Sequence, residues 1–347
     1  MAARTLTQYL LDVGSAARRT DYVHILSAVS VSVKLTAAAV SRGPLTLEPN
    51  RGEARPTDRE VNRGLRRLAT SNLLAQTESI EQLAGISISG SAAIHQVSPT
   101  GRFLLLFEAM HGMSNLIDNL PVGSAFSVLE RTGTGPCTVE DFLQPGTQLV
   151  CAGIALYGPR TVMVVTVGEG VDGFTLDRDV GNFVLTRPQL KVPSDSHVFA
   201  INPTEAPHWP NPVKRYVGEC VLGVDGPRGH DFTMRWNASA LVGAYRVLNS
   251  GGLFLVPEID KPSGWLAPLL YTAAPLAFLA EQAGGGATTG TRRVLEVVPT
   301  SLTTRVPFFF GSAEEVARIT SYFNEPDQGD EKAYSHPLFH HRTLFSD

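Results

Sequence analysis

The pattern of apolar and polar positions predicts a helical first segment. Apolar residues recur at helical spacing from Leu6 to Val40, which indicates one or two helices. Residues 43–58 are rich in Pro, Gly and Arg, a composition typical of a surface loop, and helical spacing returns from Arg59 to Gln76. We therefore expect a loop between two helical segments.

Strand patterns dominate the middle of the chain. The continuous apolar run Phe103 to Phe107 is typical of a strand that is buried on both faces. Further β-rich runs, separated by Gly, Pro and Asp, occupy residues 122–130, 148–158, 161–170 and 171–177. Because little helix lies between them, these runs predict a β-meander.

The final part mixes both patterns. Residues 198–202 and 252–257 read as strands, whereas residues 232–252 and 275–287 read as helices that end in glycines. Residues 265–280 are the most apolar stretch, but prolines interrupt them and they are shorter than the about 20 residues of a membrane span. The whole pattern predicts layers of helix and sheet, with this stretch in the core.

Composition and charge exclude several classes of protein. The 347 residues are 43% hydrophobic and 18% charged, which is typical of a globular chain, and a net charge of -4 argues against nucleic acid as a partner. The three cysteines, Cys137, Cys151 and Cys220, have no metal-ligand spacing. The first residues lack a secretory apolar segment, so we expect reduced thiols, a cytoplasmic location and no membrane partner.

Four strings of the second half stand out: GFTLDRD (173–179), VKRYV (213–217), GGLFLVP (251–257) and PTSLTTRVPFFFGS (299–312). These and further strings resemble those of the class 1 fructose-1,6-bisphosphatases, particularly the bacterial type. The resemblance covers nearly the whole chain. It implies a five-layer α-β-α-β-α fold, a phosphatase site between the two halves, and a homodimer or homotetramer. We expect domains at residues 1–195 and 196–347.

The same resemblance locates the family's metal-binding carboxylates. The family motif DPLDGSSN corresponds to EAMHGMSN, so Glu108 and His111 stand where that motif has its two metal-binding aspartates. Four further acidic positions of the family hold residues without a carboxylate: Leu68, Ser89, Gly90 and Thr272. Since magnesium requires several oxygen ligands, we expect no bound metal and no cofactor.

The substrate-binding positions of the family differ as well. Leu266 stands where the family has a basic residue for the sugar phosphate, which predicts a cavity relined by apolar side chains and a less polar substrate. Arg235 resembles the family arginine that reaches the site of a neighbouring subunit. The candidate substrate-binding residues are Ser114, Asn115, Asn202, Arg235 and Thr272.

Three hypotheses for the function follow. In the first, Glu108 and His111 form an acid-base pair, with the pKa of His111 raised by Glu108, and catalyse a metal-independent dehydration, isomerisation or cyclisation of a small molecule. In the second, the chain is an inactive pseudophosphatase with a regulatory or structural role. In the third, it is a divergent fructose-1,6-bisphosphatase, a phosphoric monoester hydrolase.

Overall fold

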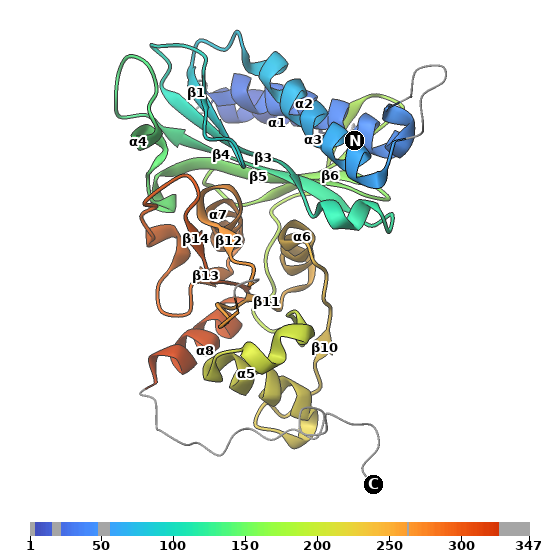
Figure 1. The fold of residues 1–347 in the computed structure, drawn as a ribbon, viewed down its shortest axis with the longest axis vertical. Helices are drawn as coiled ribbons and strands as arrows, with labels where there is room; N and C mark the ends of the chain where they lie inside the picture. Colours follow the sequence, from blue (N-terminus) through green and yellow to red (C-terminus); the bar gives the residue numbers. More distant parts are fainter. Residues whose placement is uncertain (1–3, 16–21, 48–55, 262–263, 326–347) are drawn as a thin grey trace.

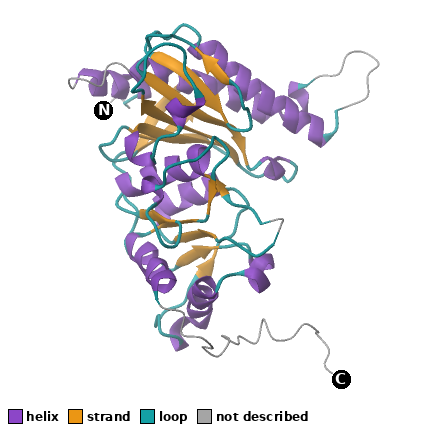
Figure 2. Cartoon of the chain, turned by 60° about the vertical axis from the view of Figure 1, so that its left-hand side comes forward, coloured by secondary structure: helices purple, strands orange, loops and turns teal. Residues whose placement is uncertain are grey.

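The computed structural model describes residues 4–15, 22–47, 56–261 and 264–325. These residues fold into five layers in the order α-β-α-β-α, with two sheets separated by helices (Figure 1). A view from another side shows the same alternation of helices and strands along the long axis (Figure 2). The layered fold that the resemblance implied is therefore confirmed.

Three helices form the first layer on one face of the larger sheet. They are α1 (Leu6–Ser15), α2 (Val23–Arg42) and α3 (Asp58–Thr77). The start of α3 is fixed by a capping box, in which the Thr57 hydroxyl accepts from the Glu60 backbone N–H and the Glu60 carboxylate accepts from the Thr57 backbone. The predicted helices are confirmed. Of the predicted loop at residues 43–58, the structure describes a 3-10 turn at Gly43–Thr46 and the residues just before α3, whereas residues 48–55 lie outside the described part of the chain, so the loop as a whole stays a prediction.

The segment Val23–Thr46, which includes α2, is long and apolar enough to cross a membrane by composition alone, with a mean hydropathy of 1.7. Its packing explains this composition. Ile25, Val29 and Val33 recur at four-residue spacing and are buried in the core between the helices and the sheet. We therefore interpret α2 as a core helix of the first layer.

The larger sheet has eight strands in the order β2-β1-β3-β4-β5-β6-β7-β8. β1 and β3 pair in parallel, whereas β3 to β8 pair antiparallel in sequence. The predicted meander is therefore confirmed for β4 to β7, and β8 extends it by a strand that the pattern did not predict. The strands are β1 (Leu83–Ile88), β2 (Ile94–Gln96), β3 (Phe103–His111), β4 (Val122–Glu130), β5 (Leu149–Tyr157), β6 (Thr161–Thr166), β7 (Asp172–Asp177) and β8 (Asn182–Arg187).

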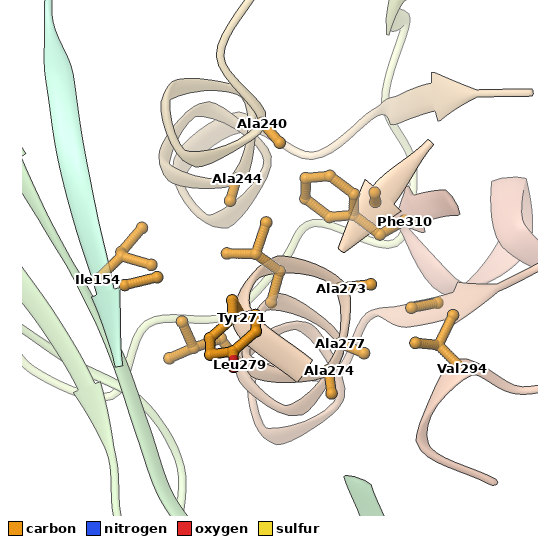
Figure 3. Close-up of a cluster of buried hydrophobic side chains, with 14 of the residues drawn as sticks. Ile154, Ala240, Ala244, Tyr271, Ala273, Ala274, Ala277, Leu279, Val294 and Phe310 are labelled. Carbon is orange, nitrogen blue, oxygen red and sulfur yellow. The ribbon is translucent and has the colours of Figure 1, made fainter. Parts of the chain in front are cut away.

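The middle layer consists of α6 (Ala240–Ser250) and α7 (Ala274–Gln282), which pack between the two sheets. Alanines on both helices let them approach closely, and Ile154 from the larger sheet and Phe310 from the smaller sheet fill the space on either side (Figure 3). This apolar cluster connects the two halves of the molecule.

The smaller sheet has five strands in the order β10-β9-β11-β15-β13, and α5 (Asn211–Leu222) and α8 (Ala313–Asn324) cover its outer face. Its strands are β9 (Val198–Ala200), β10 (Thr233–Met234), β11 (Leu253–Val256), β13 (Gly286–Thr288) and β15 (Phe308–Gly311). A separate two-stranded pair, β12 (Ala267–Pro268) and β14 (Arg305–Val306), lies beside a π-helical turn at Leu269–Ala273.

The helix predicted for residues 232–252 is wrong in its first third. The backbone N–H groups of Thr233 and Arg235 donate to the carbonyls of His197 and Phe199, both at 2.8 Å, so this segment is an edge strand beside β9. Helical structure begins only at Ala240. Pairing with a distant strand overrides the local helical spacing of these residues.

Candidate functional site

A bulge in β3 directs Glu108 and His111 to the same side of the larger sheet. In a regular strand, residues three apart point to opposite faces. The pairing of β3 with β4 is irregular between Glu108 and His111, and Ala109 and Met110 both belong to the core beneath the helices. The extra residue returns His111 to the face that Glu108 occupies.

Glu108 and His111 line a pocket of about 340 Å³ between the two halves of the molecule. Its polar side chains come from both halves: Arg66, Ser89, Glu108, His111 and Arg305. Its apolar part includes Met110, Trp265 and Pro268. The prediction of an apolar lining and a less polar substrate is wrong, because two guanidinium groups and a carboxylate lie in the wall.

Glu108 is the buried carboxylate of this pocket, with an exposed fraction of 6%. Its Oε1 lies 3.8 Å from Nη2 of Arg66, and the Ser89 hydroxyl donates a hydrogen bond to it. Burial raises the pKa of Glu108, whereas Ser89, Arg66 and Arg305 act in the opposite direction. Burial is the largest of these effects, so the pKa of Glu108 is raised overall despite the two neighbouring guanidinium groups.

His111 is held as a neutral imidazole. The backbone N–H of Ala240, at the start of α6, donates to Nε2 of His111 at 3.3 Å, and the ring meets Trp265 edge-on. Burial lowers the pKa of His111 to about 4. The predicted rise in this pKa is wrong, because loss of hydration is the dominant effect on the ring and it disfavours the imidazolium.

Gly112 makes the turn that follows β3. Its φ of 75° lies in the left-handed region, and a Cβ at this position would lie 2.8 Å from Cβ of Ser239, the residue that precedes α6. Gly135 has a φ of 85° but no atom within 4 Å of such a Cβ. An alanine would therefore strain the backbone at both positions, but only at position 112 would its Cβ also clash with Ser239.

We expect Gly135→Ala to lower the free energy of unfolding by about 1 kcal/mol and Gly112→Ala by roughly 2–4 kcal/mol, because the contact with Ser239 adds to the strain. Urea unfolding of both variants measures the difference. Equal losses at the two positions would show that the approach of the turn to α6 is not tight.

Two of the other candidates lie on the turn after His111. Ser114 is exposed. Asn115 is buried, and its amide donates to the Pro121 carbonyl at 2.9 Å and to Oδ1 of Asn237 at 3.3 Å. Asn115 therefore connects the turn to the segment that precedes α6, and a binding role for either residue stays a prediction.

The remaining three candidates lie outside the pocket wall. Asn202 accepts hydrogen bonds from the backbone and hydroxyl of Thr204 and so caps its own turn. Arg235 is exposed on the edge segment. Thr272 is fully buried in the π-helical turn, and its hydroxyl has no hydrogen-bond partner among the described residues. Their roles in substrate binding stay predictions.

Arg66 and Arg305 line the pocket, although the sequence patterns did not indicate either as a site residue. Arg66 lies on α3, two residues before Leu68, and Arg305 lies on β14 within the string PTSLTTRVPFFFGS. Nη1 of Arg305 donates to the Leu266 carbonyl at 2.8 Å, so a guanidinium lies beside the position where the resemblance implies a basic residue in the family. The sequence feature that could have indicated them is that each arginine lies in or next to a string that resembles the family.

The pocket does not fit a divalent-cation cluster. Such a cluster requires several oxygen ligands, chiefly carboxylates. Among the residues that the structure describes, no three His, Cys, Asp or Glu side chains form a group that could hold a metal. The Glu108 carboxylate shares the pocket with Arg66 and Arg305 instead.

The fold and the pocket define a layered α/β protein with a polar pocket between its two halves. The family model "Fructose-1-6-bisphosphatase, N-terminal domain" matches residues 4–188, and "Fructose-1-6-bisphosphatase, C-terminal domain" matches residues 192–324. The chain belongs to the class 1 fructose-1,6-bisphosphatase family.

Known relatives agree over the full length. The chain is 44% identical over 359 residues to a "Fructose-1,6-bisphosphatase class 1" of Hydrogenophilus thermoluteolus, covering 99% of this chain and 97% of that protein. It is 30% identical to the T-state crystal structure of Leishmania major fructose-1,6-bisphosphatase, with a TM-score of 0.80, covering 94% of this chain and 100% of that one. The apo form of the same enzyme is 29% identical, with a TM-score of 0.80 and coverages of 93% and 100%.

These comparisons overturn two of the three hypotheses. Identity of 44% across 99% of the chain indicates a fructose-1,6-bisphosphatase. Two hypotheses are therefore wrong: that of a neofunctionalised, metal-independent enzyme that is not a phosphatase, and that of a pseudophosphatase. The hypothesis of a divergent fructose-1,6-bisphosphatase agrees with the comparisons. The two hypotheses rested on the positions without a carboxylate and did not take into account the two guanidinium groups that tertiary packing brings into the pocket.

Proposed function

We propose that the chain hydrolyses a phosphate ester of fructose 1,6-bisphosphate in the pocket around Glu108. The single observation that carries this proposal is the full-length identity of 44% to a class 1 fructose-1,6-bisphosphatase. The pocket supports it, because Arg66 and Arg305 provide positive charge for an anionic substrate. Its volume of about 340 Å³ suits one small molecule.

In this proposal, Glu108 is the general base and therefore the catalytic residue. Its carboxylate takes a proton from a water molecule as the water oxygen attacks phosphorus. The ester P–O bond breaks, and the departing sugar oxygen takes a proton from solvent, which gives inorganic phosphate and a sugar hydroxyl. His111 is a positioning residue, because its hydrogen bond to the start of α6 holds this helix against the pocket.

The proposal includes a homodimer or homotetramer, with Arg235 at the subunit boundary, and a cytoplasmic location. Arg235 is exposed in the single chain and so is accessible to a second copy. The cysteines Cys137, Cys151 and Cys220 are buried free thiols, which agrees with a reducing compartment.

The test is release of inorganic phosphate from fructose 1,6-bisphosphate by the purified chain. We expect saturable turnover, with one phosphate released per sugar and a rate constant on the order of 1–10³ s⁻¹. Fructose 6-phosphate serves as the comparison substrate and distinguishes the two ester positions. Absence of phosphate release above the blank, across magnesium concentrations from zero to millimolar, would reject the proposal.

A further inference from the structure

Two arginines from distant elements converge on the pocket. Arg66 comes from α3 and Arg305 from β14. Both line the same pocket as Glu108, and Nη2 of Arg66 lies 3.8 Å from Oε1 of Glu108. Two positive charges against one negative charge leave a net positive charge in the wall.

Each arginine is anchored but keeps donors free. Nη2 of Arg66 donates to the Ser89 carbonyl at 3.0 Å, and Nη1 of Arg305 donates to the Leu266 carbonyl. A guanidinium has five N–H donors, so one such bond leaves most of them available. Both side chains are also exposed to solvent. They are therefore accessible to a ligand that enters the pocket.

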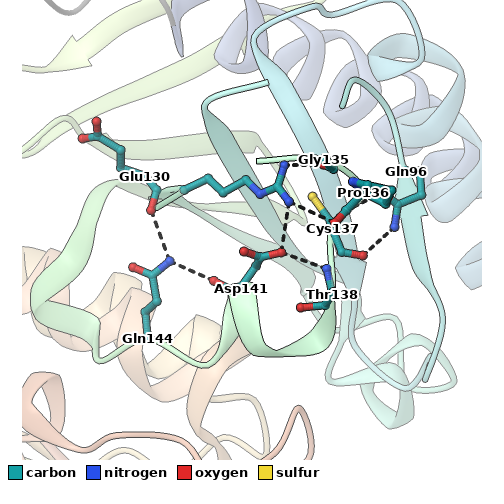
Figure 4. A network of polar contacts seen from close by, with 9 residues as sticks. Gln96, Glu130, Gly135, Pro136, Cys137, Thr138, Asp141 and Gln144 are labelled. Atoms are coloured by element: carbon teal, nitrogen blue, oxygen red, sulfur yellow. Dashed lines mark hydrogen bonds and ion pairs between the residues drawn. The ribbon is translucent and has the colours of Figure 1, made fainter. Parts of the chain in front are cut away.

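Arg131 shows the contrasting arrangement of a structural arginine. Its side chain is 2% exposed and pairs with Asp141. It also donates to the carbonyls of Gly135 and Pro136, at 2.7 and 3.0 Å, within the network around Asp141 and Thr138 (Figure 4). No comparable set of partners holds Arg66, whose described contacts are one carbonyl and one distant carboxylate.

The ion pair between Arg66 and Glu108 is weak enough to yield to a ligand. At 3.8 Å, the Nη2 to Oε1 distance is too long for a hydrogen bond. Arg66 is also 45% exposed, and exposed ion pairs contribute little to stability. Phosphate oxygens accept charge-assisted, bidentate hydrogen bonds from arginine, which are stronger than this contact.

Gly90 leaves the space that Arg66 occupies. Its φ is 81°, and a Cβ there would lie 3.0 Å from Nη2 of Arg66. A carboxylate-bearing side chain at this position would compete with the guanidinium for the same volume. A glycine at position 90 thus leaves room for the Arg66 guanidinium beside the pocket.

Resting on the proposed function, we propose that Arg66 and Arg305 together bind the phosphate group of the substrate, with Arg66 leaving Glu108 for the phosphate oxygens. The ligand class is a dianionic phosphate ester of a small sugar. Glu108 then lies beside the bound phosphate, where its negative charge opposes ground-state binding.

The test is calorimetric titration of inorganic phosphate and of fructose 1,6-bisphosphate into the full chain, in buffer that contains EDTA. We expect Arg66→Gln and Arg305→Gln each to weaken binding by about 10- to 100-fold. Arg178→Gln, at an exposed arginine in the turn between β7 and β8, is the matched control and should bind as the unsubstituted chain does.

For Glu108→Gln we expect the opposite change in affinity, tighter phosphate binding, which a misfolded variant would not show. Removing the negative charge should tighten phosphate binding several-fold, because both guanidinium groups then face the ligand without competition. Circular dichroism confirms that each variant is folded. Unchanged affinity in both arginine variants, or no saturable binding by the unsubstituted chain, would overturn the inference.

The outcomes separate this inference from the proposed function. If the chain hydrolyses fructose 1,6-bisphosphate but the arginine variants bind phosphate unchanged, the proposed function holds and the binding role of Arg66 and Arg305 is rejected. If phosphate binding depends on the two arginines but no hydrolysis occurs, their binding role holds and the phosphatase reaction is rejected.

Discussion

Glu108→Gln is expected to slow phosphate release from fructose 1,6-bisphosphate by about 10²- to 10⁴-fold, because glutamine cannot accept the proton of the attacking water. The carboxylate is buried at the end of β3 and receives a hydrogen bond from Ser89. Glutamine has nearly the same size, so the pocket should keep its shape. Steady-state kinetics measure kcat and KM separately.

The control for this variant is Glu130→Gln, which makes the same chemical change on an exposed carboxylate. Glu130 pairs with Arg102 at 2.7 Å at the far end of β4 and is 47% exposed. We expect its kcat to match that of the unsubstituted chain. If Glu108→Gln also retains full kcat, Glu108 is not the general base.

The second large effect concerns stability. Phe254→Ala should lower the free energy of unfolding by about 3–5 kcal/mol, because it leaves a cavity between α6 and the smaller sheet. The ring is 1% exposed and packs against Phe310, with centroids 5.4 Å apart. A Cβ at Gly243 of α6 would lie 2.4 Å from this ring, so the helix rests directly on it.

Urea unfolding measures this loss, and Val180→Ala is the comparison at a side chain that is 67% exposed. We expect Val180→Ala to change the free energy of unfolding by less than about 0.5 kcal/mol. A loss at Phe254 no larger than that at Val180 would mean that α6 does not depend on this contact. Such a result would also weaken the link between α6 and His111.

The apolar run at residues 103–107 illustrates how far the pattern leads. It predicts a buried strand, and β3 begins at Phe103 as expected. The pattern places the polar Glu108 and His111 at the end of this strand but does not show that the strand pairing continues to His111. Nor does it show the bulge, which depends on pairing with β4.

The segment around Arg235 illustrates a competing long-range effect. Its local spacing favours a helix, yet its backbone pairs with β9, more than thirty positions earlier in the chain. Sequence spacing cannot reveal such pairing, because the hydrogen-bond partners are brought together only by the fold. The helix therefore begins later, at Ala240, whose backbone N–H donates to Nε2 of His111.

The sequence by itself determined most of the succession of helices and strands, since periodicity is a local property that follows from which side chains can be buried together. Its strings also determined the family and hence the five layers. Only the tertiary structure decided which charges meet in the pocket. Arg66 and Arg305 lie far apart in the chain, and the packing of α3 and β14 around Glu108 alone brings them to one place. The charge balance of the site is therefore a property of the fold, because electrostatic interactions depend on distance in space.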